Sequence, residues 1–449
     1  MKRTLLGTIV SMIAIGIGCG AYGASDAGQL YAGTAKVDIS PENTVEDHGQ
    51  IFCLPEVPPD PPVPPDNIHD PLYARVVVLK NSTVSVAIVT LDLPEFSSKW
   101  VIDKAKSLYG IDHVVLCASH THSGMWPRGM VVDTSWTRNM QDPGVSLNWP
   151  GFSADPWYAA TEQKVLATIG QANANLFPAR IAAGKGAYES VYLGHNRRFV
   201  RPGGGVTMMW DNPKRIPTKP ADPTVRVIRI EDEAGKPRVL MVHYACHPVI
   251  LMGAGVISRD FPGAMVDYVE QQLGESCMAM FLQGASGDID PYEISLRGEY
   301  GFNMIRQSGI SLGKAALRVA DDMASPEAAE TSMRVKESML KISYRRGNGK
   351  TDACIMTVVI NDDLAMVSMP GEVFCQHQLN LAAESPIAST FILGLSYSGR
   401  GSPYMLYIPT AQAVQQGGYG ATTASFVAAD AGERMVNAAV AAIKELKNR

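Results

Sequence analysis

The sequence has few cysteines, no excess of positive charge and no apolar run long enough to span a membrane. Only seven of its 449 residues are cysteine, and no Cys-x-x-Cys pair occurs, which excludes a zinc ribbon or a thioredoxin-type site. Its 39 lysines and arginines are outnumbered by 44 aspartates and glutamates, which argues against a nucleic-acid-binding protein. No stretch reaches the roughly 18 apolar residues of a transmembrane helix, so no transmembrane segment is expected.

Apolar residues, by contrast, are plentiful. They make up 46% of the chain, which suffices for a large core and excludes global disorder. The length allows one large domain or two to three ordinary ones. Cys117, Cys246 and Cys277 lie in apolar runs that we predict to be strands, so we expect buried thiols rather than a disulfide scaffold.

Residues 1–24 have the pattern of a signal peptide. Lys2 and Arg3 precede an apolar run from Leu5 to Ile17, and small residues at 21–24 offer a cleavage site. We therefore expect an exported protein, periplasmic or extracellular, with residues 25–449 as the mature chain. Cys19 offers an alternative, a lipid anchor at the cell surface.

Strand-like and helix-like segments alternate along the chain. Apolar runs predict strands at residues 74–79, 83–91, 114–118, 225–230, 238–246, 277–283 and 364–369. Helical periodicity with capping residues predicts helices at 98–109, 156–174, 261–273 and 426–446. This order predicts an α/β or mixed α+β architecture.

Two stretches break the alternation. Pro55 to Pro71 contains eight prolines and predicts an extended surface insertion rather than an interdomain linker. Met125 to Phe152 holds three of the six tryptophans in an irregular segment. We interpret this second stretch as a lid or pocket wall, with ordinary packing under a long loop as the alternative.

Polar side chains follow four of the predicted strands at the points where the strands end. His120 and His122 follow the strand at 114–118, and His247 follows 238–246. Asp288 follows 277–283, and Glu372 follows 364–369. Because ligands of α/β sheets bind beyond the carboxyl ends of strands, we expect these side chains to form one site.

Imidazoles two residues apart lie on one side of an extended segment and can serve a metal centre. Alone, the His-x-His pattern is equally consistent with two structural histidines in a loop, whose ring nitrogens form ordinary hydrogen bonds. His247 and Glu372 at other strand ends favour the metal site, since zinc binds imidazole and carboxylate ligands. Three protein ligands and a water form an open catalytic site that lowers the pKa of that water to about 7.

Short motifs spread from residue 34 to about 420 resemble those of the neutral/alkaline non-lysosomal ceramidases. The matching segments are residues 34–41 (TAKVDISP), 120–124 (HTHSG), 196–198 (NRR), 246–248 (CHP), 260–263 (DFPG), 287–291 (GDIDP) and 370–372 (PGE). The resemblance implies a zinc-dependent hydrolase of linear amide bonds whose catalytic domain covers nearly the whole mature chain, a single large domain from residue 25 to 449.

The resemblance also implies the site residues. In that family zinc is held by two histidines, a glutamate and a late tyrosine, which correspond here to His120, His247, Glu372 and Tyr407. Tyr404 is an alternative to Tyr407, but residues 407–410 (YIPT) resemble the family segment better.

Three further residues gain roles from the same resemblance. His122 corresponds to a proton-transferring histidine, and Arg197 to an arginine that holds the developing oxyanion. Tyr419, twelve residues after Tyr407, corresponds to a substrate-contacting tyrosine. The implied substrate is a small-molecule or lipid N-acyl amide.

Two departures from the family pattern affect this interpretation. Asp290 stands where ceramidases have a serine, and Ser286 lies at a different offset, so no nucleophile role is transferred. Because an activated water needs no serine, hydrolysis is still expected, but ceramide is less firmly indicated than the zinc chemistry. Ceramidases also carry a C-terminal β-sandwich, whereas this sequence ends in a predicted helix, so we expect none.

The remaining acids and histidines of interest have simpler expected roles. We expect the matched aspartates to cap turns or orient ligand histidines, and two other histidines to be structural; they are Asp38, Asp92, Asp260, Asp288, His195 and His243.

Other functions remain as alternatives. The chain can be a secreted binding protein that keeps the scaffold without the activity, or a zinc hydrolase of a non-lipid, glycan-derived amide. A barrel-type metal hydrolase is disfavoured because several strands precede His120 and no fitting metal-bridging lysine follows. A metallo-β-lactamase is excluded by the residues after His122, Ser123-Gly124-Met125.

Overall fold

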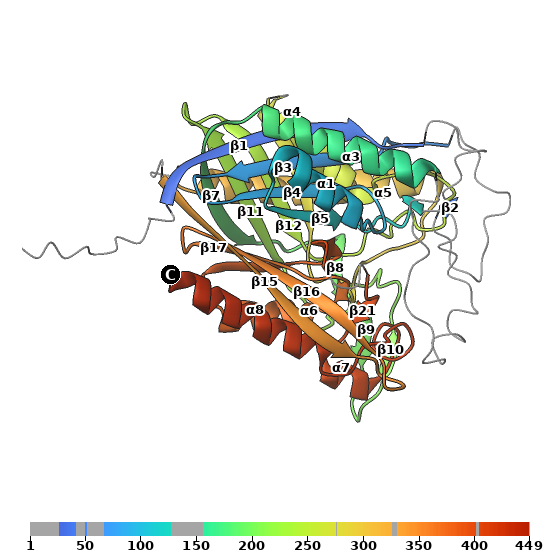
Figure 1. Ribbon diagram of the computed structural model, residues 1–449. Helices are drawn as coiled ribbons and strands as arrows, with labels where there is room; N and C mark the ends of the chain where they lie inside the picture. The colour runs from blue at the N-terminus through green and yellow to red at the C-terminus, as the bar shows by residue number, and fades with distance from the viewer. Residues whose placement is uncertain are drawn as a thin grey trace, which may run out of the picture.

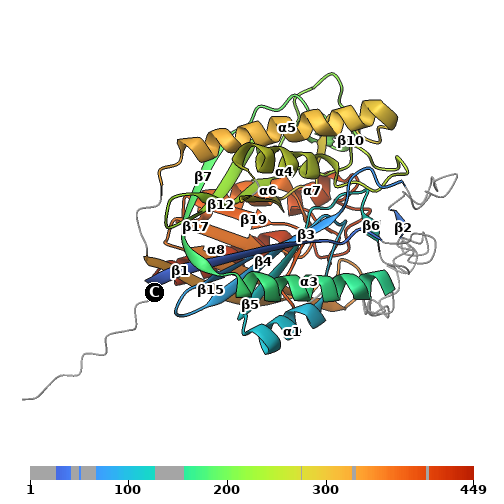
Figure 2. The same cartoon turned by 90° about the horizontal axis from the view of Figure 1, so that it is seen from above.

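The computed structural model describes residues 27–41, 50–51, 67–126, 156–274, 276–325, 330–400 and 404–448. They form four layers, in which two β-sheets lie face to face and helices cover both outer faces (Figures 1 and 2). Within these two sheets most neighbouring strands are antiparallel, but the pairs β4–β5, β12–β13 and β17–β19 are parallel. The predicted mixed α/β architecture of one domain is therefore confirmed.

The first sheet has the order β13-β12-β11-β7-β1-β3-β4-β5-β20. Its strands are β1 (Ala27–Asp38), β3 (Tyr73–Lys80), β4 (Ser85–Leu91), β5 (His113–Ala118), β7 (Phe177–Ala187), β11 (Thr224–Asp232), β12 (Pro237–Tyr244), β13 (Met278–Gln283) and β20 (Ser396–Tyr397). Both of its faces are buried. In β4, for example, Val86 and Ile88 face the second sheet, while Ala87 and Val89 face the helices. Burial on both faces explains why such strands are continuous apolar runs.

The second sheet has the order β15-β16-β17-β19, with β15 (Glu330–Ser343), β16 (Lys350–Ile360), β17 (Leu364–Ser368) and β19 (Ser389–Leu393). The first residues of β1 pair with β15, which joins the two sheets. Between the sheets lies an apolar core to which Met241 and Ile88 contribute from one side and Met356 and Met366 from the other.

Six helices form the two outer layers. They are α1 (Lys99–Tyr109) and α3 (Pro156–Ala174) over β1 and β3–β5, α4 (Asp260–Leu273) and α5 (Gly298–Asp322) over β11–β13, and α6 (Cys375–Glu384) and α8 (Ala431–Lys447) over the second sheet. Local signals fix their ends. The Ser98 side chain accepts from the Val101 N–H at the start of α1, and Gly110 ends that helix at φ 66°.

Short strands and one short helix complete the fold. They are β2 (Gln50–Ile51), β6 (Met125–Trp126), β8 (Leu193–Asn196), β9 (Arg198–Val200), β10 (Val206–Met208), β14 (Ile289–Pro291), β18 (Glu372–Val373), β21 (Tyr407–Ile408) and α7 (Ala411–Gln416). The pairs β8–β14 and β18–β21 bring segments far apart in sequence next to one another.

The predicted strands and helices are all present within a few residues, except for the start of the last helix. It begins at Ala431 rather than Phe426, because residues 426–428 bond instead to the end of β15 and the turn after it. The Arg345 N–H donates to the Phe426 carbonyl, and the Ala428 N–H donates to the Ser343 carbonyl. Extended pairing thus replaces the first turn of the expected helix.

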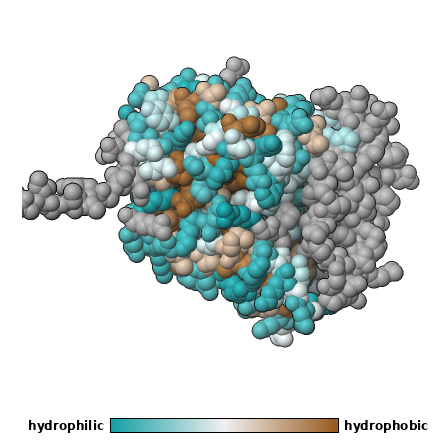
Figure 3. Space-filling model, viewed as in Figure 1, coloured by the Kyte–Doolittle hydropathy of each residue, from teal (hydrophilic) through white to brown (hydrophobic). Residues whose placement is uncertain are grey.

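The described cysteines are all buried and unbridged, as expected for apolar strand residues: Cys117, Cys246, Cys277, Cys354 and Cys375. None of the helices in the described ranges is long and apolar enough to span a bilayer. On the face seen in Figure 3, hydrophilic residues predominate among the described ones, and hydrophobic residues lie interspersed between them.

Candidate active site

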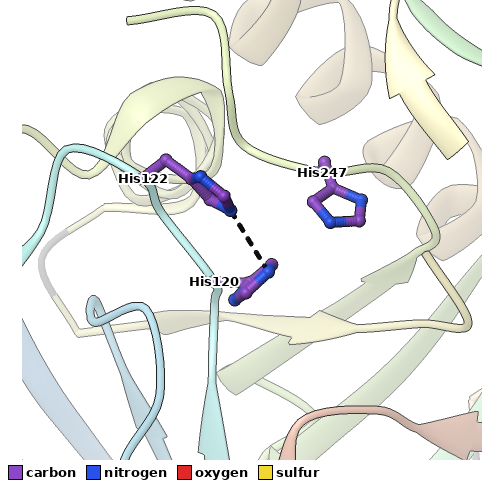
Figure 4. Close-up of side chains that lie close together, drawn as sticks. All are labelled: His120, His122 and His247. Carbon is purple, nitrogen blue, oxygen red and sulfur yellow. Dashed lines mark hydrogen bonds between the residues drawn. The ribbon is translucent and has the colours of Figure 1, made fainter. Parts of the chain in front are cut away.

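Three histidines converge beyond the ends of β5 and β12 (Figure 4). His120 and His122 lie on the loop after β5, and His247 lies three residues after the end of β12. The Nε2 atoms of His120 and His122 are 3.2 Å apart, and one ring nitrogen of each of the three histidines lies within 4.8 Å of the others. His120 has φ 70°, a backbone conformation that a non-glycine residue adopts at a cost and that is common at functional sites.

Backbone carbonyls fix the orientation of two of these rings. The Nδ1 of His120 lies 2.6 Å from the Pro94 carbonyl, and the Nδ1 of His247 lies 2.7 Å from the Ser286 carbonyl. A carbonyl can only accept, so each Nδ1 carries the proton and donates it. In the neutral imidazole this leaves Nε2 unprotonated, which is the form that binds a metal.

Glu372 lies opposite these two nitrogen atoms. Its Oε2 is 3.0 Å from His247 Nε2 and 3.4 Å from His120 Nε2. Burial alone would raise the pKa of Glu372, but its neighbours His120 and His247 lower it well below its usual range. The backbone of Gly287 runs so close that a Cβ there would lie 2.4 Å from the Glu372 carbonyl oxygen, so glycine is required.

The donor set fits a divalent cation. With Nδ1 donating, His247 Nε2 and Glu372 Oε2 are both acceptors at 3.0 Å, and His120 Nε2 is a third acceptor directed at the same oxygen. Facing acceptors repel one another unless a proton or a cation lies between them. Imidazole and carboxylate donors in a buried site are the ligands that zinc prefers.

Two tyrosines contact the same carboxylate. The Tyr404 hydroxyl donates to Glu372 Oε1, and the Tyr407 hydroxyl also bonds to Glu372. Tyr407 is directly opposite Glu372 in the β18–β21 pair, and its ring stacks on His247 with centroids 6.4 Å apart. The structure therefore brings both candidate tyrosines to the site, rather than only one.

His122 is a buried, neutral imidazole. Burial lowers its pKa well below the usual value, and the neighbouring His120 and His247 lower it further. A neutral ring next to the candidate ligands can accept a proton at physiological pH.

Arg197 lies between β8 and β9, and both of its terminal amino groups have partners. Nη1 donates to Asp290 Oδ1 at 3.0 Å, and Nη2 donates to the Gly287 carbonyl at 2.8 Å. Its guanidinium carbon also lies 5.2–5.6 Å from the ring centroids of three aromatic residues, Trp210, Tyr407 and Tyr419. Arg197 is thus a fixed cation in an aromatic frame.

Tyr419 bridges the candidate metal centre and the surface. Its ring packs edge-on against Tyr407 and Trp210, with centroids 5.4 and 5.3 Å away. Trp210 is 39% exposed and was not predicted as a site residue. The only feature of the sequence that could have indicated Trp210 is that it is a tryptophan in an irregular segment, thirteen residues after Arg197.

The fold of this chain matches solved ceramidase structures. A neutral ceramidase from Pseudomonas aeruginosa matches with a TM-score of 0.67 over 93% of this chain and 75% of its own, at 17% identity. The fold is that of the neutral ceramidases. A second structure, described as ceramidase complexed with C2, matches with the same TM-score over 93% of this chain and 76% of its own, at 16% identity.

Sequence comparison alone finds no such likeness. No model of a known protein family matches the chain, and no curated protein matches its sequence. The short motifs and the fold therefore both indicate a likeness to the ceramidases, although the sequence identity to the solved structures is only 16–17%.

The aspartates and histidines that were expected to have structural roles form hydrogen bonds with neighbouring backbone and side chains. Asp288 accepts from Asn196 Nδ2 and the Cys375 N–H, and Asp260 accepts from the Leu251 N–H. The other predicted residues bond similarly: Asp38 to Ser40, Asp92 to Arg75, His195 to the Met209 carbonyl and His243 to the Ile392 carbonyl.

Other predictions fall outside the described residues. They concern the signal peptide with Cys19, most of the proline-rich segment, and residues 127–152 of the tryptophan-rich segment. These interpretations stay predictions.

Proposed function

We propose that the protein is an exported zinc-dependent amidohydrolase that cleaves a neutral N-acyl amide. One observation carries the proposal: two histidine Nε2 atoms, each unprotonated because its Nδ1 donates to a carbonyl, face the carboxylate of Glu372 inside a ceramidase fold. A cation between these acceptors would relieve their repulsion, and zinc fits the donors.

Four residues would hold the zinc ion. They are His120, His247, Glu372 and Tyr407, with Tyr404 bonded to the second oxygen of Glu372. When bound, zinc would polarise the substrate carbonyl and lower the pKa of a water molecule to about 7. The burial of the whole group excludes bulk water and strengthens each of these interactions.

The remaining residues would complete the hydrolysis. His122, whose ring is kept neutral by its lowered pKa, would accept a proton from the attacking water and deliver it to the leaving nitrogen. Arg197 would stabilise the negative charge that develops on the carbonyl oxygen. Tyr419, with Trp210 beside it, would contact the substrate.

A ceramide-like or related N-acyl amide is the proposed substrate class. Support comes from the solved ceramidase structures, whose fold this chain shares, and from the aromatic wall that Tyr419 and Trp210 build beside Arg197. A glycan-derived amide is the second substrate class to test.

The proposal of export rests on the pattern of residues 1–24. A lipidated Cys19 is the alternative N-terminus of the processed protein. Intact-mass analysis of the protein recovered from a host that secretes it distinguishes the two. Cleavage after residue 24 gives an unmodified chain, whereas an anchored protein begins at an acylated Cys19.

Hydrolysis of a short-chain fluorescent ceramide tests the proposal, with a glycan-derived amide in parallel and a chelator as control. The proposal expects stoichiometric zinc and turnover that the chelator abolishes. His120→Ala should lose both zinc and activity, whereas His113→Ala, at the start of the same strand and bonded to Glu337, should keep them.

Three results would contradict the proposal. They are protein without zinc, activity that the chelator leaves intact, or a His120→Ala variant that keeps metal and activity. Bound zinc without any turnover would instead support a binding protein on a ceramidase scaffold.

A further inference from the structure

Asp290 is a buried carboxylate that contacts two parts of the candidate site at once. It lies in β14, which pairs with β8, and its side chain is 1% exposed. Its Oδ1 is 3.0 Å from Arg197 Nη1 and 3.6 Å from His247 Nδ1. No step of the proposed hydrolysis uses this group, although an unpaired carboxylate at this depth would be costly.

Arg197 depends on Asp290 for both its place and its charge balance. The side chain is 4% exposed, and burial works against its charge, but Asp290 raises the pKa of Arg197 above its usual value. Asp290 and the Gly287 carbonyl hold the two terminal amino groups on the protein side. The buried Nε–H has no partner among the described residues, which leaves a donor for a ligand.

The same carboxylate cancels most of the positive field that Arg197 would otherwise present. Paired charges about 3 Å apart act at longer range as a dipole, whereas a lone buried guanidinium attracts any anion strongly. A substrate with its own carboxylate would therefore find no net countercharge at Arg197. An uncharged amide can still use the fixed Nε–H.

We propose, on the basis of the proposed hydrolase function, that Asp290 is a positioning and specificity residue. It fixes Arg197 in its aromatic frame and neutralises it, so that the site accepts neutral N-acyl amides and discriminates against anionic ones such as N-acyl amino acids.

Two substitutions separate the two roles of Asp290. Asp290→Asn keeps an oxygen that can accept from Arg197 but removes the charge, whereas Asp290→Ala removes both. Asp222→Asn is the matched control, because Asp222 is also buried and pairs with Arg226 at 2.8 Å, away from the candidate ligands.

Steady-state kinetics should use an N-acyl amino alcohol and an N-acyl amino acid with the same acyl chain. Asp290→Asn should lower KM for the anionic substrate roughly tenfold or more, with a smaller change for the neutral one. Asp290→Ala should lower kcat for both substrates by roughly 100-fold, since Arg197 is then no longer held. Asp222→Asn should keep the wild-type ratio of the KM values for the two substrates. An Asp290→Asn variant that also keeps this ratio would overturn the proposal.

A binding measurement keeps this test separate from the hydrolysis. Calorimetric titration of the zinc-loaded protein with octanoate should give a Kd roughly tenfold lower for Asp290→Asn than for the wild type and for Asp222→Asn. If the wild type hydrolyses neither amide, the proposed function fails, and the octanoate result still decides the role of Asp290. Equal octanoate affinity in all three proteins would refute that role.

Discussion

Glu372 is held on both of its oxygens. Oε2 faces His120 and His247, while Oε1 accepts from the Tyr404 hydroxyl. A hydrogen bond of this kind fixes which oxygen a metal can use, and such supporting bonds contribute much of a site's metal affinity. The tyrosine three residues before the proposed ligand Tyr407 therefore has a role of its own.

Tyr404→Phe should weaken zinc binding by roughly 10- to 100-fold, because Glu372 loses the bond that orients it. Competition with a chromophoric chelator measures the affinity. Tyr397→Phe, which alters another buried tyrosine of the same region, serves as the control and should bind zinc as the wild type does. Equal affinity for all three proteins would show that Tyr404 does not orient Glu372.

Glu95, next to the carbonyl that orients His120, is a second buried carboxyl at this depth. Burial raises its pKa to about 7, although the Ser97 hydroxyl and the neighbouring His120 oppose the shift. The folded protein thus retains a proton on Glu95 that the unfolded chain loses near pH 4.5. Stability contributed by this proton is complete below pH 4.5 and is lost as the pH rises to about 7.

Glu95→Gln, which stays neutral at every pH, should therefore gain stability relative to the wild type between pH 4.5 and 7. A shift of this size corresponds to about 3 kcal/mol, reached near pH 7 and constant above it. Urea denaturation across this pH range in EDTA measures the difference. A difference that does not vary with pH would mean that folding leaves the pKa of Glu95 unchanged.

The residues of the candidate site differ in how far the sequence could predict them. His120, His247 and Glu372 were predictable because each follows an apolar strand, and strand ends converge at one edge of a sheet. The contacts of Tyr404 with Glu372 and of Asp290 with Arg197 were not, because they depend on the pairs β18–β21 and β8–β14. Pairs of two or three residues leave no periodicity in a sequence.

At the scale of elements, the same reasoning explains what the sequence missed. The strands β4 and β13 are uninterrupted apolar runs, so they were found. Helix α5, the longest of the described helices, was not predicted because Gly301, Gly309 and Gly313 interrupt its pattern. These glycines serve packing rather than flexibility: a Cβ at Gly309 would lie 2.6 Å from the Met265 backbone nitrogen in α4.

Gly309→Ala should therefore destabilise the protein, although alanine is the better helix former by about 1 kcal/mol. The added methyl group meets backbone of α4 that cannot move aside cheaply, and overpacking of this kind costs about 1–3 kcal/mol. Chemical denaturation measures the loss. Gln307→Ala, at an exposed position of the same helix, should change stability by less than about 0.5 kcal/mol. A stabilised Gly309→Ala variant would show that α4 and α5 do not pack this closely.

At the scale of the whole molecule, the candidate site ties together parts of the chain that are distant in sequence. Its four proposed ligands come from the loops after β5 and β12 of the first sheet and from the separate β18–β21 pair. A ligand that binds these groups only in the folded chain stabilises the entire fold.

Removing zinc should therefore lower the stability of the whole domain, not only its activity. With free zinc at 100 times its Kd, the expected loss is about 2.7 kcal/mol. Thermal unfolding with and without chelator measures it, and His120→Ala should unfold at the same temperature in both conditions. A wild-type protein whose unfolding temperature is the same with zinc and with chelator would contradict a zinc site built from these distant segments.

Anomalous diffraction at the zinc absorption edge, from crystals grown with zinc, tests the central claim most directly. The account predicts one strong peak within about 2.0–2.3 Å of His120 Nε2, His247 Nε2, a Glu372 oxygen and the Tyr407 hydroxyl. A peak held by other residues, or no peak between these four, would contradict it.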